Sequence, residues 1–277
     1  MWCPAAAGTL ALTTDASPLQ LVAADAALAR VYHVCTDAIG TAYTASSEGA
    51  LVAISGTGSA ARLCSRTAGD VRSGGWGHMI GDEGSGYWIA SRAIKTVFRT
   101  MDGFAKSDED AARGAAYGAV LRAAMMEHFA LTVPGDLLSH MYSDFRKDHV
   151  ASFCKRVADA AVAGDALAKD IFAHAGANLA RMVAALVPHV PSAKASASVD
   201  IVCVGSVWKS FALFERAFMD TLLAGGGVES RRLRHVRLLR LRQSSALGAA
   251  LLGARAAHVD LPLDFASFTE TLGEAEA

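Results

Sequence analysis

Residues 51–59 read Leu-Val-Ala-Ile-Ser-Gly-Thr-Gly-Ser, and the apolar run at 51–54 is typical of a buried strand. Because residues 60–64 can return as a second strand, we predict a β-hairpin with a glycine-rich tip. Glycines let a backbone approach a ligand closely, and successive N–H groups can bind an anion. The tip (Gly56, Thr57, Gly58) therefore has two interpretations, an ordinary hairpin turn or a phosphate site.

A second strand pattern, 201–204, ends at the turn Gly205-Ser206. Such a turn between a buried strand and a helix is a typical place for a nucleotide, although it is also compatible with an ordinary connection. Alternation of strands with helices predicts an α/β fold. The further elements that we predict are helices at 18–29, after residue 86, and at 109–130, 150–163, 165–187, 207–222 and 244–257, strands at 31–35 and 234–241, and a tail after residue 260 that is a short helix or disordered.

The loop at 73–86 combines many glycines with Trp76, His78, Asp82 and Glu83. Backbone groups and a carboxylate can hydrogen-bond the hydroxyl groups of a sugar, while an indole supplies an apolar wall. The alternative interpretations are purely structural: His78 packs in the fold, and Asp82 or Ser85 caps the following helix. The loop therefore indicates a site for a polar, hydroxyl-rich ligand.

Asp37 follows a predicted strand, in the stretch Thr36-Asp37-Ala38-Ile39-Gly40. A carboxylate at the carboxyl end of a strand can take a proton from an attacking hydroxyl if it faces a cleft. Aspartate is also common in turns, where its side chain bonds to nearby backbone. The spacing alone leaves both interpretations open.

Composition narrows the class of protein. The chain has 277 residues, 52% of them hydrophobic and 19% charged, and a net charge of 26 − 27 = −1, which disfavours disorder and a globally basic nucleic-acid binder. Arginines between 231 and 242 alternate with leucines, which favours a strand with a solvated basic face. Five scattered cysteines favour reduced thiols in the cytoplasm over a disulfide framework, an iron–sulfur cluster or another metal site. We expect no membrane span and no secretory signal.

Several motifs together resemble the N-acetylglucosamine kinases of eukaryotic type, within the actin/hexokinase-like ATPase group. The resemblance runs from about residue 20 to 257. Its long and specific motif is Gly-Gly-Trp-Gly-His-Met-Ile-Gly-Asp-Glu-Gly-Ser-Gly-Tyr-Trp at 74–88. Shorter matches are Thr-Asp-Ala at 36–38, Ile-Ser-Gly-Thr-Gly-Ser at 54–59, Asp-Phe at 144–145, Phe-Cys-Lys at 153–155, Cys-Val-Gly-Ser-Val-Trp-Lys-Ser at 203–210 and Ser-Ser-Ala-Leu-Gly-Ala at 244–249.

The resemblance implies transfer of the γ-phosphoryl group of ATP to the 6-hydroxyl of an amino sugar, with Mg²⁺ on the phosphates and a cytoplasmic homodimer as the working form. It assigns Asp37 as general base and Gly75, Trp76, Gly77 and Asp82 as sugar contacts. It assigns Gly56, Thr57 and Gly58 to the phosphates, and Ala151, Gly205 and Ser206 to the adenine and ribose side. The implied fold has two lobes around a cleft, each lobe built on a ribonuclease-H-like sheet.

Residues 1–35 lack the Gly-Gly-Gly-Thr turn and the sugar-binding asparagine with which such kinases begin. We therefore expect an incomplete first lobe, with residues 1–46 as its remnant, 47–248 as the nucleotide- and sugar-binding lobe, and 249–277 as a helix and tail. The alternative is a non-catalytic homologue that retains a sugar or nucleotide pocket, or an interaction module. Activators of 2-hydroxyacyl-CoA dehydratases share the ATPase group, but they cluster cysteines around iron and sulfur. Glucosamine and N-acetylmuramic acid stay open as substrates.

Overall fold

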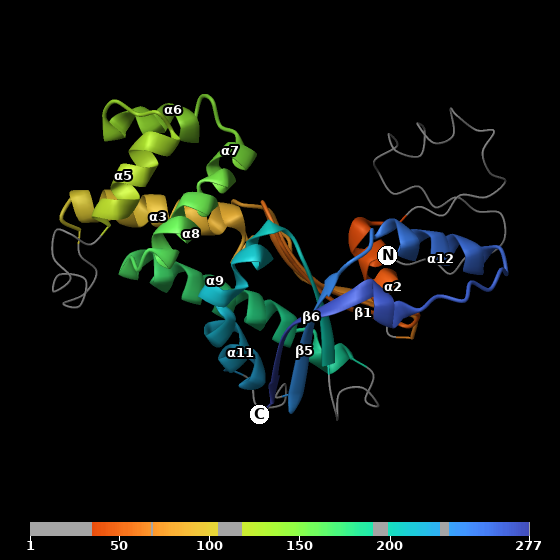
Figure 1. Ribbon diagram of the computed structural model, residues 1–277. Coiled ribbons are helices and arrows are strands. Elements are labelled where there is room, and N and C mark those ends of the chain that lie inside the picture. Colours follow the sequence, from red (N-terminus) through yellow and green to blue (C-terminus); the bar gives the residue numbers. More distant parts are fainter. Residues whose placement is uncertain (1–34, 68, 105–117, 191–198, 228–232, 277) are drawn as a thin grey trace, which may run out of the picture.

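The computed structural model describes residues 35–67, 69–104, 118–190, 199–227 and 233–276, which form a sheet with helices on both faces (Figure 1). The six strands lie in the order β3-β2-β1-β4-β5-β6. They are β1 (Gly49–Ser55), β2 (Ser59–Ser65), β3 (Gly69–Gly74), β4 (Val199–Val204), β5 (His235–Leu241) and β6 (Thr269–Glu276). Strand β1 pairs parallel with β4, and β4 with β5, whereas the other neighbours are antiparallel. This mixed sheet confirms the α/β class.

The predicted hairpin is β1 and β2, whose register closes at the pair Ser55 and Ser59 around the glycine tip. Strand β3 was not predicted, because its six residues, Gly-Asp-Val-Arg-Ser-Gly, include only one large apolar side chain. Backbone pairing with β2 makes it a strand all the same. An edge strand of this kind depends on its neighbour more than on its own propensity.

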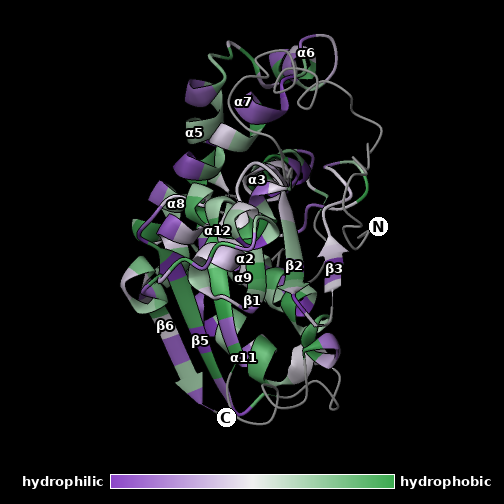
Figure 2. Cartoon of the chain, turned by 90° about the vertical axis from the view of Figure 1, so that its right-hand side faces the viewer, coloured by the Kyte–Doolittle hydropathy of each residue, from purple (hydrophilic) through white to green (hydrophobic). Residues whose placement is uncertain are grey.

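The two faces of the sheet carry two helical layers, because successive strand residues point to opposite sides. Leu51 and Ala53 belong to the large core cluster, which includes α3 (Gly86–Met101), α9 (Ala166–Ala184) and α11 (Glu215–Leu223). Val52 belongs to a small cluster under α2 (Asp37–Ala45), beside which lies α12 (Ala246–Ala256). In Figure 2, strands β5 and β6 show hydrophilic bands between hydrophobic ones.

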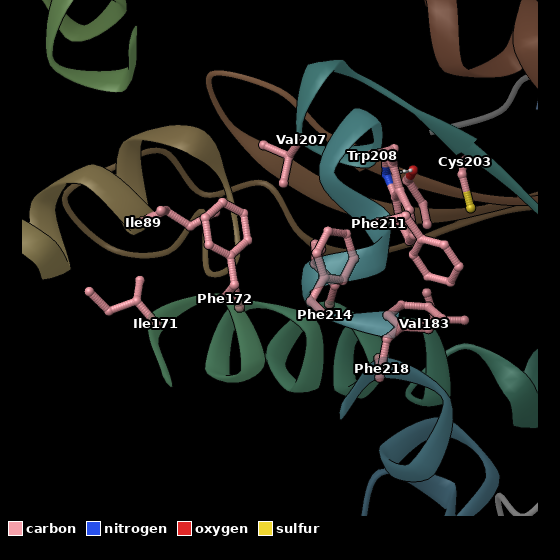
Figure 3. Close-up of a cluster of buried hydrophobic side chains, with 14 of the residues drawn as sticks. Ile89, Ile171, Phe172, Val183, Cys203, Val207, Trp208, Phe211, Phe214 and Phe218 are labelled. Atoms are coloured by element: carbon pink, nitrogen blue, oxygen red, sulfur yellow. Dashed lines mark hydrogen bonds between the residues drawn. The ribbon is translucent and has the colours of Figure 1, made fainter. Parts of the chain in front are cut away.

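Aromatic side chains fill the large cluster between the sheet and α9 (Figure 3). Trp208 lies 5.3–5.9 Å, centroid to centroid, from the rings of Phe211, Phe214 and Phe218. Its indole N–H donates to the carbonyl oxygen of Ala53 at 3.1 Å, which joins the segment after β4 to β1. This bond satisfies the polar atom that a buried tryptophan brings into the core.

Within the described residues, one helix, Ala166–His189, is long and apolar enough to cross a membrane. Its most apolar window is 61% buried inside the protein. Residues such as Ile171, Phe172 and Leu179 are at most 1% exposed and belong to the large cluster. The apolar character of α9 therefore reflects its place in the core.

Helices α2 and α12 cross at two glycines. A Cβ on Gly248 would lie 1.9 Å from the carbonyl oxygen of Gly40, so only glycine permits this approach. The Thr44 hydroxyl accepts from the Gly248 N–H at 2.8 Å and donates to the Gly40 carbonyl at 2.9 Å. The predicted helix at 244–257 is confirmed, and its small residues serve this close packing.

The remaining α-helices lie beyond α3, and their bounds differ from the prediction. They are α5 (Ala119–His128), α6 (Leu137–Met141), α7 (Lys147–Ser152) and α8 (Cys154–Val162). Short 3₁₀ turns occur elsewhere along the chain, at Pro134–Asp136, Val187–His189, Ser206–Leu213, Gly225–Gly227 and Phe265–Phe268. The helix predicted at 150–163 is thus two helices that meet at Phe153, a side chain with no exposed surface. The helix at 18–29 and residues 31–34 of the predicted strand lie outside the described residues.

The prediction for the tail was wrong, because residues 269–276 form strand β6 against β5. Its acidic residues meet the arginines of the neighbouring segment: Glu270 pairs with Arg240 at 2.5 Å and with Arg242 at 3.2 Å. Leu272 and Ala275 pack against the core. The acidic tail and the basic strand are complementary only when they are paired, which neither segment reveals alone.

Candidate functional site

The two glycine turns predicted to bind a nucleotide meet at one edge of the sheet. Because β1 and β4 are parallel, their carboxyl ends bring the hairpin tip and the turn Gly205-Ser206 together. The Cβ position of Gly56 lies 3.9 Å from the Gly205 Cα. Gly205 has φ +110°, and a Cβ there would lie 2.2 Å from the Ser55 carbonyl oxygen. Any side chain at position 205 would therefore clash with the backbone of Ser55, so only glycine fits here.

Ala151 joins the same edge through Gly86. The Gly86 N–H donates to the carbonyl oxygen of Gly56 at 2.7 Å. A Cβ on Gly86 would lie 3.1 Å from that oxygen and 3.4 Å from the carbonyl oxygen of Ala151. The structure therefore brings together the residues predicted for the nucleotide: Gly56, Thr57, Gly58, Ala151, Gly205 and Ser206. Thr57 and Ser206 are exposed there.

The end of the 73–86 loop is fastened to the hairpin by two buried serines. The hydroxyl of Ser55 donates to the Gly84 carbonyl at 2.8 Å, and that of Ser59 donates to the Glu83 carbonyl at 2.7 Å. Ser85 then caps α3, because its hydroxyl accepts the Trp88 N–H at 3.1 Å. Of the two predicted helix caps, Ser85 is the one the structure uses.

Asp82 lies under the hairpin tip and is 3% exposed. Its backbone has φ +59°, which is unusual for a residue other than glycine. The Oδ1 atom accepts the Ser59 N–H at 3.4 Å, and Oδ2 accepts from the ammonium of Lys147 at 2.8 Å. Sequence reasoning missed Lys147, because it stands 65 positions away and lies between the short matched stretches 144–145 and 153–155, outside both.

The part of the 73–86 loop around Trp76 is exposed to solvent. Trp76 is 64% exposed, and the guanidinium of Arg72 lies 4.2 Å from its ring centroid. Gly75 and Gly77 on either side have φ +74° and +85°, and no atom lies within 4 Å of a Cβ built at Gly77. His78 packs against Phe145 at 5.1 Å, which supports its structural interpretation. Trp76, Met79 and Ile80 are the exposed side chains of this part of the loop, and the two glycines are half-buried.

Asp37 is exposed at the first position of α2, and its Oδ1 accepts the Ala38 N–H at 2.8 Å. The preceding hydroxyl, on Thr36, accepts from the guanidinium of Arg62 at 3.3 Å. Arg62 stands opposite Arg72 in the β2–β3 register, and Arg72 covers Trp76. Arg62 is ion-paired with Asp70, so the structure places Asp37 and Trp76 beside neighbouring arginines of β2 and β3 without a direct contact between them.

Burial favours the protonated thiol form of the cysteines near this site. Burial raises the pKa of the Cys64 thiol to about 12 and that of Cys154 to about 12. The pKa of Cys35, two residues before Asp37, is also raised by burial. The reactive form of cysteine is the thiolate, so these side chains are protonated and unreactive at neutral pH.

A sheet of this order, with glycine turns converging at the carboxyl ends of its parallel strands, defines an α/β ATPase-type fold. The model of the BadF/BadG/BcrA/BcrD ATPase family matches residues 16–253, and the chain belongs to this family.

A curated relative, the N-acetylmuramic acid/N-acetylglucosamine kinase of Clostridium acetobutylicum, is 35% identical over 138 residues. That match covers 50% of this chain and 42% of the relative, so the matched segment spans less than half the length of the relative.

Two solved structures share the fold. A candidate N-acetylglucosamine kinase from Chromobacterium violaceum superposes with a TM-score of 0.54 at 21% identity, over 79% of this chain and 64% of the other. A second candidate N-acetylglucosamine kinase, from Porphyromonas gingivalis, gives 0.50 at 14% identity, over 80% and 66%. These likenesses concern the fold.

Proposed function

We propose that the protein is an ATP-dependent kinase of N-acetylated amino sugars, with N-acetylglucosamine as substrate and its 6-phosphate as product. One observation carries the proposal: the glycine hairpin, the Gly205 turn and Ala151 converge at one sheet edge, and the tryptophan loop is bonded to that hairpin. Family membership and the names of the relatives point to the same nucleotide and the same class of sugar.

In the proposed reaction, the carboxylate of Asp37 takes the proton of the sugar 6-hydroxyl, and the resulting oxygen attacks the γ-phosphorus while ADP leaves. Gly75, Trp76, Gly77 and Asp82 hold the sugar, with the exposed indole against its apolar face. The hairpin tip holds the phosphates, and Ala151, Gly205 and Ser206 hold the adenine and ribose. Catalysis of this kind rests mostly on positioning and on stabilisation of charge.

The tip suits an anion, since Thr57 is exposed and its hydroxyl takes part in no hydrogen bond within the described residues. Mg²⁺ binds with few protein ligands when phosphates and waters supply the rest of its shell. We propose that the ion arrives with ATP and neutralises phosphate charge.

The proposal also includes a cytoplasmic location, which the resemblance implies and which free thiols fit. Cys35, Cys64, Cys154 and Cys203 are unpaired, as suits a cytoplasmic protein. A homodimer, an incomplete first lobe, the eukaryotic grouping and the division at residues 46 and 248 stay predictions.

The test is release of ADP by the chain with N-acetylglucosamine, N-acetylmannosamine, N-acetylmuramic acid or glucosamine. We expect sugar-dependent turnover that falls at least about 100-fold in Asp37→Asn, the range over which general bases act. The exposed Asp159 on α8 provides a matched control, Asp159→Asn, which should retain turnover. Sugar-dependent turnover that persists in Asp37→Asn would remove the assigned base.

The second candidate is a non-catalytic sugar- or nucleotide-binding protein. It is favoured by the surroundings of Asp37, whose exposed carboxylate is bonded to the Ala38 N–H at the start of α2. Calorimetry separates the two: binding of N-acetylglucosamine without turnover, lost in Trp76→Ala, would support the second candidate.

A further inference from the structure

We propose that Lys147 is a positioning residue that couples the 73–86 loop (the sugar loop) to the residues of the nucleotide side through Asp82. The inference rests on the proposed function, and it adds a role for a residue that no motif indicated. It begins with the ion pair between the Lys147 ammonium and the Asp82 carboxylate, 2.8 Å apart.

The Asp82 carboxylate needs this partner because its side chain is only 5% exposed. A buried charge is strongly unfavourable unless it is paired and hydrogen-bonded. The Ser59 N–H, at 3.4 Å, is a long and therefore weak second contact. Lys147 is thus the main compensation for the Asp82 charge among the described residues.

The pair connects elements that are far apart in sequence. Asp82 belongs to the sugar loop and lies against Gly58, whose Cβ position is 3.0 Å from Oδ2. Lys147 is the first residue of α7, and Ala151 follows on the same short helix, about 6 Å further along its axis. A shift of α7 when a nucleotide binds beside Ala151 therefore moves the cation that holds Asp82.

The accessible part of the pair is Lys147, whose side chain is 33% exposed, whereas that of Asp82 is 5% exposed. An ammonium has three donors, and the bond to Asp82 uses one of them. A ligand can thus reach the pair from the Lys147 side without breaking it, so sugar and nucleotide would reinforce each other through it.

The first test measures the dissociation constant of N-acetylglucosamine by calorimetry, with and without a non-hydrolysable ATP analogue. Coupling between sites is commonly 5- to 150-fold, and we expect about 10-fold in the natural protein. In Lys147→Met we expect coupling below about 2-fold, with the affinity for the analogue alone changed less than 2-fold. Lys147→Arg should restore part of the coupling, and the control Lys155→Met, on α8, should retain all of it.

Two outcomes would overturn the proposal. Unchanged coupling in Lys147→Met would show that the ion pair transmits nothing. Equal weakening of the analogue with and without sugar would make Lys147 a direct phosphate contact instead. Lys147→Gln, which keeps a donor for Asp82, replaces the methionine variant if that variant fails to fold.

A second measurement, amide hydrogen exchange without ligands, does not depend on the proposed function. In Lys147→Met the Ser59 amide and the amides of 82–86 should exchange at least about 5-fold faster than in Lys155→Met. If the natural protein binds neither sugar nor nucleotide, the proposed function fails, and this arm alone decides whether Lys147 ties the loop to the hairpin. Equal exchange rates of these amides in the two variants would show that Lys147 does not hold the loop against the hairpin.

Discussion

Replacement of Gly205 by alanine tests the convergence of the two glycine turns most directly. The residue has φ +110°, and the added Cβ would lie 2.2 Å from the Ser55 carbonyl oxygen and 2.8 Å from the Gly56 nitrogen. A contact of about 3.4 Å is the ordinary limit, so β1 and β4 must separate by roughly 1 Å at the site.

The loss of stability that we expect from Gly205→Ala has two parts. Backbone strain at such a φ costs about 1–3 kcal/mol, and forced overpacking typically costs another 1–3 kcal/mol. Gly164 supplies a matched control, since it has φ +103° but no atom within 4 Å of its Cβ position. We therefore expect Gly205→Ala to lower the free energy of unfolding by about 1–3 kcal/mol more than Gly164→Ala does.

The assay is urea denaturation of both variants, followed by binding of an ATP analogue. A displacement of about 1 Å commonly costs two orders of magnitude in rate, so Gly205→Ala should also bind or turn over nucleotide poorly. If Gly205→Ala and Gly164→Ala were equally stable, the close approach of the two turns would be refuted.

Three further predictions concern the core, the histidines and the thiols. Trp208→Phe removes the bond to the Ala53 carbonyl and should lower the free energy of unfolding by about 1–3 kcal/mol in urea, whereas Trp88→Phe, at a half-buried ring, should cost less. Burial lowers the pKa of His128 below 6.5, so the unfolded chain binds more protons than the folded one at acidic pH. Stability should therefore fall as the pH drops below about 6.5, less so in His128→Gln, and an identical pH profile in the variant would contradict this reasoning. Because the pKa values of Cys64 and Cys154 are raised to about 12, iodoacetamide at pH 8 should label them far more slowly in the folded than in the urea-unfolded protein, as read by mass spectrometry.

Local sequence was sufficient for the hairpin at 51–64, the helix after residue 86, the strand at 235–241 and the α/β class. Each of these elements has an apolar periodicity or a glycine boundary within a single window, and such signals act over a few residues. The same is true of the motif glycines, which marked where the backbone would come close to another group. The assigned roles of Asp37, Trp76 and the phosphate-side residues remain predictions, because their chemistry needs a ligand.

Tertiary structure alone decided which of these segments meet. Strand β6 exists because β5 offers it backbone hydrogen bonds and its Leu272 and Ala275 pack against the core, and β3 exists because β2 offers it hydrogen bonds. The ion pair of Asp82 with Lys147 spans 65 positions, and the contact of Gly205 with Ser55 spans 150 (205 − 55). Such partners are chosen by the parallel pairing of β1 with β4 and by burial of charge, which are properties of the assembled sheet and not of any one segment.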